Sequence, residues 1–262
     1  MGMNDPDGDP RITSYVAVGD SFTEGLGDAA ADGTLIGWAD RLAGHLSRQR
    51  PQTAFSYANL AIRGTLIDEI IEGQVPRARA LHPDLVTFCA GGNDLLRPGS
   101  DPDRIADRYD RAVAGLVQDA GTVVLFTGFD TRGIPVLRHL RGRIATYTAH
   151  VRAIADRHGC PVVDLWSLDA VRDRRAWTDD RLHLSSYGHT QVALRAADLL
   201  TPGKRARAAT ARPMAPTRSP ATRRSDDLHW AREHFVPWVG RRLFGGSAAD
   251  DARPKRPDLL PL

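Results

Sequence analysis

The 262-residue sequence contains two cysteines, Cys89 and Cys160, and lacks any apolar run long enough to span a membrane. A membrane-spanning helix needs about 18–20 consecutive apolar residues. Two cysteines in a chain of this length do not make a disulfide framework, and neither has neighbours at the spacing of zinc ligands. Because each cysteine borders an apolar run, we expect both to be small buried core residues.

The sequence also lacks the features of a secretory signal and of a nucleic-acid-binding domain. Its N-terminal stretch, MGMNDPDGDPRITSYV, has no basic region followed by an apolar one, so we expect a cytoplasmic protein. The net charge of +3 is unevenly distributed, because residues 201–262 contain 13 Lys and Arg but 6 Asp and Glu. The first 200 residues are slightly acidic, which argues against specific nucleic-acid binding by the body of the protein.

What the sequence does contain is a regular alternation of short apolar runs and longer segments with helical periodicity. The apolar runs predict strands at residues 13–19, 55–61, 84–91, 122–128 and 161–166. Between them, Leu and other apolar residues recur every three or four positions, and Pro76 is expected to bend or end one helix. Continuous apolar strands separated by helices predict an α/β fold, with a parallel sheet covered by helices on both faces.

The composition of the sequence changes near residue 201, where Ala, Arg, Thr and Pro become frequent and the apolar periodicity ends. We expect a flexible N-terminus over residues 1–11, one domain over 12–200, a basic linker over 201–225, an amphipathic helix over 226–246 and a disordered tail over 247–262. The helix carries Trp230, Phe235 and Trp238 among arginines. It could lie on an anionic membrane surface, pack onto the body of the protein or bind a partner protein. Packing against protein is favoured, because that is the commoner role of such helices.

The first candidate for chemistry is Ser21, in the segment VAVGDSFTEGLGD, where a predicted strand ends. Sites in α/β proteins lie beyond the carboxyl ends of the strands. Backbone N–H groups at such a turn can stabilise an oxyanion, and glycines let a substrate come close. The alternative is an ordinary turn in which the Gly-Asp-Ser segment only caps a helix.

A serine nucleophile needs a base, and the segment WTDDRLHLSSYGH offers Asp180 and His183. An aspartate three positions before a histidine can accept the imidazole N–H and leave the other ring nitrogen for the serine. Asp179 and His189 are nearby competitors, and we assign His189 to helix packing or to the surface.

An oxyanion needs hydrogen-bond donors, and two further strand ends supply candidates. Asn93 follows two glycines in AGGNDLL, and its side-chain amide is a suitable donor. Gly64 in NLAIRG could add a backbone N–H. Each of them could instead be a turn residue, Gly64 at a positive φ.

Taken together, these segments resemble the four sequence blocks of the GDSL-type, or SGNH, hydrolase family. The resemblance covers about residues 12–200, through GDSFTEG, NLAIRG, GGND and DRLHLSSYGH. Phe22 replaces the leucine of the GDSL name, and Ala61 stands where many members have glycine.

The resemblance implies a flavodoxin-like three-layer α/β/α fold with a five-stranded parallel sheet. It also implies ester hydrolysis without a metal or organic cofactor. Ser21 would be the nucleophile, His183 the base and Asp180 its orienting partner. The backbone N–H groups of Ser21 and Gly64, with the Asn93 amide, would bind the oxyanion. Asp20 would shape the turn.

The substrate is expected to be a small-molecule ester with a small or medium acyl group, because the sequence shows no long apolar lid. Four arginines of one loop, Arg132, Arg138, Arg141 and Arg143, could attract an anionic substrate or could form a solvated charged surface. Three alternatives stay open: an acyltransferase with the same triad, a scaffold recruited through residues 226–246, and an inactive binding module. The presence of both Ser21 and His183 argues against the last.

Overall fold

The computed structural model describes residues 12–49, 51–134, 137–201 and 252–262. This part of the chain contains a six-stranded sheet in the order β5-β4-β3-β1-β2-β6. The strands are β1 (Ser14–Gly19), β2 (Ser56–Asn59), β3 (Leu85–Cys89), β4 (Thr122–Phe126), β5 (Val162–Val163) and β6 (Arg256–Pro261). Strands β1 to β5 are parallel, and their order is the doubly wound, flavodoxin-like one.

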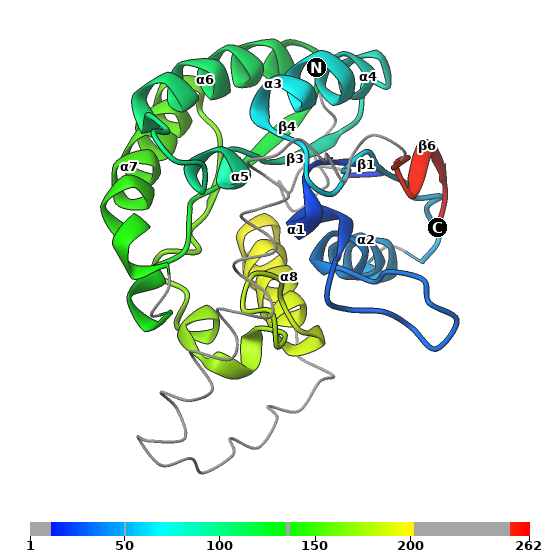
Figure 1. The fold of residues 1–262 in the computed structure, drawn as a ribbon. Helices are drawn as coiled ribbons and strands as arrows, with labels where there is room; N and C mark the ends of the chain where they lie inside the picture. The colour runs from blue at the N-terminus through cyan, green and yellow to red at the C-terminus, as the bar shows by residue number, and fades with distance from the viewer. Residues whose placement is uncertain (1–11, 50, 135–136, 202–251) are drawn as a thin grey trace.

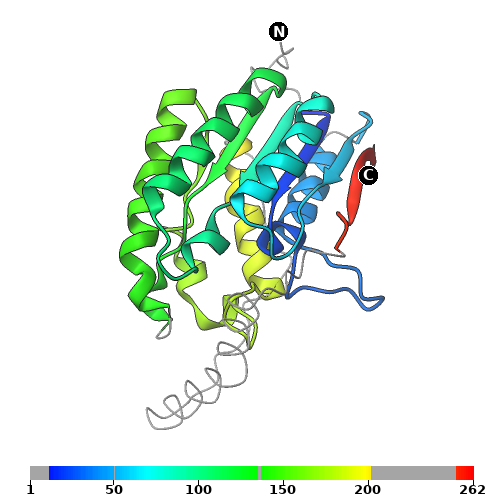
Figure 2. The same ribbon diagram turned by 45° about the horizontal axis from the view of Figure 1, so that its top comes forward.

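Helices cover both faces of the sheet, as the alternating sequence pattern predicts (Figures 1 and 2). On one face lie α2 (Trp38–Gln49) and α8 (Ser186–Leu200), which pack against each other and share a buried core with the sheet. The opposite face carries α3 (Ile67–Glu69), α4 (Val75–Ala80), α6 (Pro102–Asp119) and α7 (Arg141–His158) over a second core. Two short helices, α1 (Ser21–Glu24) and α5 (Gly92–Leu95), begin just beyond the carboxyl ends of β1 and β3.

Local signals in the sequence explain the helix ends. The Asp101 carboxylate accepts a hydrogen bond from the Asp103 N–H and caps α6, and Ser185 caps α8 in the same way. Gly159 ends α7 in the left-handed conformation, at φ 66°. Pro76 lies in the first turn of α4, where its missing N–H costs no hydrogen bond. α4 continues directly from α3 through a π-helical segment, η1 (Ile70–Gln74), so Pro76 follows an interruption of the regular α-helical hydrogen bonding and does not end the helix.

The five predicted parallel strands are confirmed, and the structure adds a sixth strand; the prediction of a disordered tail over residues 247–262 is wrong for residues 252–262. Strand β6 pairs antiparallel with β2 at the edge of the sheet (Figure 1). Prolines at positions 257 and 261 favoured disorder in the sequence, but an edge strand tolerates proline because one side of it needs no N–H donors. The predicted N-terminal segment, the linker after Thr201 and the helix over 226–246 lie outside the described residues.

Lys255 fastens this C-terminal segment to the body of the protein. Its ammonium group donates to the carbonyl oxygens of Glu24 (2.6 Å) and Leu35 (3.0 Å) and to a carboxylate oxygen of Asp40 (2.6 Å). Glu24 is the last residue of α1, the helix that begins at Ser21. The C-terminal segment therefore supports the loop that follows Ser21, from a position more than 200 residues away in the chain.

We expect Lys255→Met to lower the free energy of unfolding by about 1–3 kcal/mol, because it removes charge-assisted hydrogen bonds from a mostly buried site. Asp258→Ala is the matched control in the same segment. It breaks an exposed ion pair with Arg77, and such pairs contribute about 0–1 kcal/mol. Urea unfolding of both variants measures the difference. Equal effects would show that Lys255 does not hold the segment in place.

Within the described ranges, no helix combines the length and the apolar character needed to cross a bilayer. The cytoplasmic location expected from the N-terminal composition stays a prediction.

Candidate active site

Ser21 lies at the sharp turn between β1 and α1. The Asp20 carboxylate accepts a hydrogen bond from the Phe22 N–H at 3.0 Å and so caps α1, as predicted for the residue beside the serine. Gly19 comes so close to its neighbours that an added Cβ would lie 2.4 Å from Thr23 Oγ1 and 2.6 Å from the Cys89 carbonyl oxygen. The turn therefore depends on glycine, and it places the Ser21 side chain beyond the sheet, at the edge of a cavity.

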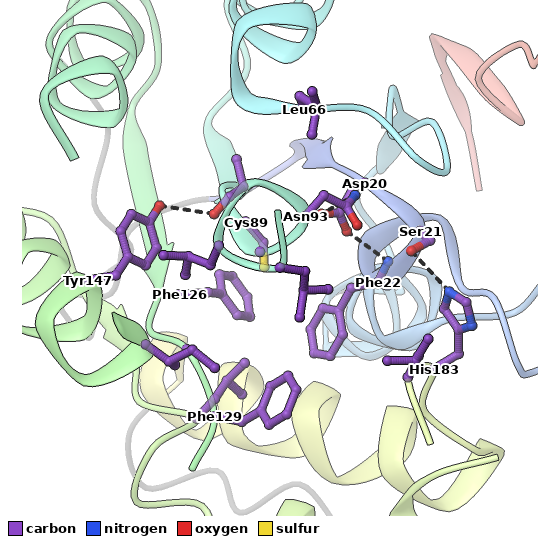
Figure 3. A pocket seen from close by; sticks show the side chains of 18 of the residues that line it. Asp20, Ser21, Phe22, Leu66, Cys89, Asn93, Phe126, Phe129, Tyr147 and His183 are labelled. Carbon is purple, nitrogen blue, oxygen red and sulfur yellow. Dashed lines mark hydrogen bonds between the residues drawn. The ribbon is translucent and has the colours of Figure 1, made fainter. Parts of the chain in front are cut away.

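A chain of hydrogen bonds joins Ser21, His183 and Asp180. Figure 3 shows the bond between Ser21 and His183. His183 Nε2 lies 3.2 Å from Ser21 Oγ, and His183 Nδ1 lies 2.6 Å from Asp180 Oδ2. The structure thus brings the three predicted side chains together in the predicted order. Asp179, the competing carboxylate, is fully exposed and lies 3.5 Å from Arg174.

The Asp180 carboxylate is held in place by its own loop. Its Oδ1 atom accepts hydrogen bonds from the backbone N–H groups of Leu182 (2.9 Å) and His183 (3.0 Å) and from the Thr178 hydroxyl (2.5 Å). Burial by itself raises the pKa of Asp180, but the hydrogen bonds and positive charge of His183, together with Thr178, hold that pKa well below its usual range. Asp180 is therefore an anion that orients the imidazole at any pH near neutrality.

The loop after Ser21 and the loop that carries His183 are in direct contact. Gly27, at φ 93°, packs so tightly that an added Cβ would lie 2.3 Å from the Leu184 carbonyl oxygen and 3.3 Å from His183 Cβ. Only glycine allows both the positive φ and this close approach. The contact fixes the position of His183 relative to Ser21, although the two residues lie near opposite ends of the domain sequence.

Asn93 and Gly64 reach the same cavity as Ser21. The Asn93 side-chain amide donates to Asp20 Oδ2 at 3.2 Å and to the Thr65 carbonyl oxygen at 3.0 Å. Gly64 has φ 84°, a conformation that favours glycine, in the loop that follows β2. The four sequence blocks therefore meet at one edge of the sheet, beside the point where the strand order reverses.

Two buried side chains, Glu24 and Gln74, hold these loops in position. Neither was predicted as a site residue from the sequence. Glu24 accepts hydrogen bonds from the backbone N–H of Arg63 (2.7 Å) and from Arg63 Nε (3.0 Å), and so ties the Gly64 loop to α1. The Gln74 amide forms a pair of 2.9 Å hydrogen bonds with the backbone N–H and C=O of Gly19. Glu24 could have been recognised from the sequence, because it is a carboxylate among glycines three residues after Ser21. Gln74 had no local signal, because its partner is 55 residues away.

His189 is buried and has a structural place, in agreement with its assignment to helix packing. Its Nδ1 atom accepts from the Trp38 N–H at 3.1 Å, and its Nε2–H donates to the Leu26 carbonyl oxygen at 3.1 Å. This arrangement needs a neutral ring. Burial lowers the pKa of His189 from 6.5 to about 4, and the hydrogen bond to Leu26 only partly opposes it.

This buried histidine should make folding sensitive to acid. The unfolded chain binds the His189 proton below about pH 6.5, whereas the folded protein binds it only below about pH 4, so stability is lost as the pH falls between these values. We expect the wild type to lose about 2 kcal/mol more between pH 7 and pH 5 than His189→Gln, whose amide can keep one donor and one acceptor. Urea unfolding at both pH values measures this difference. Equal losses would contradict the neutral, buried state of the ring.

The cavity beside Ser21 has a volume of about 600 Å³, within the ~300–1,000 Å³ typical of small-molecule sites. Apolar side chains from several elements form most of its lining, including Phe22, Leu66, Leu95, Phe126, Phe129 and Ile144. Cys89 also lines it, so the expectation that both cysteines are buried core residues holds only in part. Both cysteines are partly exposed, and burial still raises the pKa of each thiol, that of Cys160 to about 11.

The four arginines expected in one loop after β4 do not line this cavity, and two of them, Arg141 and Arg143, lie in the first turn of α7. Arg141 and Arg132 form ion pairs with the buried Asp130 carboxylate, at 2.7 and 3.3 Å, and the Arg143 side chain donates to the Arg97 carbonyl oxygen at 3.4 Å. Arg141 also lies over the Trp166 ring. These contacts favour a structural role for the loop over the attraction of an anionic substrate.

Comparison with known proteins identifies the family of the chain and solved structures of similar fold. The model of the GDSL-like lipase/acylhydrolase family matches residues 17–191, about two thirds of the chain. Among solved structures, the fold is similar to that of Axe2, an acetylxylan esterase from Geobacillus stearothermophilus. It has 19% sequence identity and a TM-score of 0.63, over 76% of this chain and 96% of that one.

A second similar structure is LAE5, an α/β hydrolase from the metagenome of Lake Arreo in Spain. It has 22% identity and a TM-score of 0.61, over 72% of this chain and 94% of that one. None of the curated proteins compared with the chain matches it. On the family match, the chain belongs to the GDSL-like lipase/acylhydrolase family and is a carboxylic ester hydrolase.

Proposed function

We propose that the protein hydrolyses esters through an acyl-enzyme formed on Ser21, with His183 as general base and acid and Asp180 as its orienting partner. The observation that carries the proposal is the hydrogen-bond chain from Asp180 through His183 to Ser21 at the edge of an apolar cavity. Variants of one serine, one histidine and one aspartate of Axe2 are described as catalytic mutants of that enzyme, and its aspartate also precedes its histidine by three positions.

The reaction proceeds in two halves. His183 Nε2 takes the proton of Ser21 as Oγ attacks the ester carbonyl carbon, and a tetrahedral intermediate forms. Its collapse breaks the bond to the alcohol oxygen, which leaves with the proton from His183. Water then attacks the acyl-serine by the same route and releases the carboxylic acid and free Ser21. Asp180 stays ionised throughout and stabilises the imidazolium.

The negative charge on the carbonyl oxygen needs donors in both halves. We assign this role to the backbone N–H groups of Ser21 and Gly64 and to the Asn93 amide, which border the same cavity. An oxyanion here would take over the Asn93 N–H that now points to Asp20 at 3.2 Å, the longer of that amide's two contacts. The Glu24–Arg63 pair would hold the Gly64 loop in place for this contact.

Covalent capture of the intermediate tests the proposal. A p-nitrophenyl alkylphosphonate should release one equivalent of p-nitrophenol and leave its phosphonyl group on Ser21, identified by peptide mass spectrometry. His183→Ala should react far more slowly, because the serine then has no base. Denatured protein is the control for nonspecific labelling. Labelling of another residue, or equally fast labelling of His183→Ala, would overturn the assignment of the nucleophile and its base.

A further inference from the structure

We infer that the acyl group accepted at Ser21 is a linear apolar chain of about six to ten carbons, lying across the ends of β3 and β4 towards Tyr147. This inference rests on the proposed function, because it names the acyl group carried by the same serine. It narrows the range expected from the sequence and excludes acetyl as the preferred group.

The direction of the chain follows from the order of strands along the cavity. Ser21 follows β1, the Tyr147 hydroxyl contacts Ala90 just after β3, and Ile144 packs against Gly128 just after β4. In Figure 3, Ser21 and His183 lie on one side of the cavity, Tyr147 lies on the opposite side, and Phe126 lies between them. On the β2 side the cavity is lined by the charged Arg63 and Glu69, so we expect an apolar acyl chain on Ser21 to extend in the other direction, across the ends of β3 and β4.

The length follows from the spacing of the strands. From β1 across β3 to β4 there are two spacings of about 4.8 Å, or about 10 Å. An extended hydrocarbon chain with tetrahedral C–C bonds of about 1.5 Å advances by about 1.3 Å per carbon. About eight carbons thus span the distance from Ser21 to the end of β4, where Ile144 of α7 packs against Gly128, whereas an acetyl group would leave most of the cavity empty.

The far wall is apolar and fixed. Tyr147 donates its hydroxyl hydrogen to the Ala90 carbonyl oxygen at 3.0 Å, so this polar atom is already satisfied. Gly91, at φ 84°, packs against the same hydroxyl, and an added Cβ would lie 2.6 Å from it. Ile144, one turn earlier on α7, and Leu137 complete this end of the cavity, and both are buried. These three side chains offer an acyl chain apolar contact and a defined stop.

Fold similarity does not carry over the acyl preference of the acetylxylan esterase Axe2, which is 19% identical to this chain. The cavity makes a different prediction. Each methylene group buried on binding contributes about a fourfold gain in affinity. Even with part of that gain realised, kcat/KM for octanoate should exceed that for acetate at least 100-fold, and the gain should stop when the chain reaches α7.

Hydrolysis of p-nitrophenyl esters from acetate to dodecanoate tests the inference, with Ile144→Phe and Ile144→Ala beside the wild type. Ile144→Phe should lower the ratio of kcat/KM for octanoate to that for acetate at least tenfold. Ile144→Ala should move the preferred length upward by one or two carbons. Ala149→Phe adds the same ring to an exposed position of α7 outside the cavity, and it should leave the ratio unchanged.

The outcomes separate this inference from the function on which it rests. If acetate is the best substrate, or if neither Ile144 variant changes the ratio, the chain-length inference fails while ester hydrolysis at Ser21 stands. If no ester is hydrolysed, or if Ser21→Ala hydrolyses them as the wild type does, the proposed function itself fails. Should Ile144→Phe not fold, the upward shift in Ile144→Ala still decides the question.

Discussion

Ser21→Ala should lower kcat for ester hydrolysis by about 10⁴–10⁶-fold, the range seen when a serine nucleophile is removed from a triad. The methyl group cannot attack the carbonyl carbon or form the acyl-enzyme. The oxyanion donors and the cavity remain, so a small residual rate above that of free water should persist. Steady-state hydrolysis of p-nitrophenyl octanoate, with purified protein at high concentration, measures both rates.

The variant should keep its fold, because Ser21 Oγ has one observed partner, His183, at 3.2 Å. Its midpoint of thermal unfolding should stay within a few degrees of the wild type. Ser47→Ala is a matched control on α2, outside the cavity, and should hydrolyse the ester at the wild-type rate. A wild-type rate in Ser21→Ala would refute the acyl-enzyme mechanism.

The strands and helices that surround this serine could be predicted from the sequence because their signals are local. Strands β1, β3 and β4 are continuous apolar runs buried on both faces of the sheet, and their parallel direction follows from the β-α alternation. The caps of α6 and α8 depend on Asp101 and Ser185, within three residues of the groups they bind. The Asp180–His183 pair was visible for the same reason, since both residues belong to one turn.

Long-range pairings could not be predicted in this way. Strand β6 is stabilised by pairing with β2 and by the hydrogen bonds of Lys255, whose partners lie about 200 residues earlier in the chain. The residues of β6 themselves do not reveal these partners. The arginines of residues 132–143 left the attraction of an anionic substrate open as an alternative, because their partner Asp130 could not be recognised from the sequence. The cavity is the clearest case, because its walls come from segments spread over most of the domain.

Asp180→Asn should lower kcat by about 10³–10⁴-fold although the side chain keeps its size. The reason lies in the two oxygens of Asp180. Oδ1 accepts hydrogen bonds from the Leu182 and His183 N–H groups, so in the variant the amide oxygen must take that place. The amide NH₂ then faces His183 Nδ1, which must accept a hydrogen bond and therefore cannot carry a proton.

This change moves the imidazole proton to the wrong nitrogen. With Nδ1 unprotonated, neutral His183 carries its hydrogen on Nε2, which then points at Ser21 Oγ and cannot accept the serine proton. Thr178→Val is the comparison, because it removes one hydrogen bond to Asp180 Oδ1 without altering the tautomer, and we expect a loss of less than about tenfold. The NMR signals of the His183 ring should show Nε2 protonated in Asp180→Asn and Nδ1 protonated in the wild type. An asparagine variant with the wild-type tautomer and wild-type kcat would mean that Asp180 only packs against the ring, and that the orientation of His183 comes from its backbone.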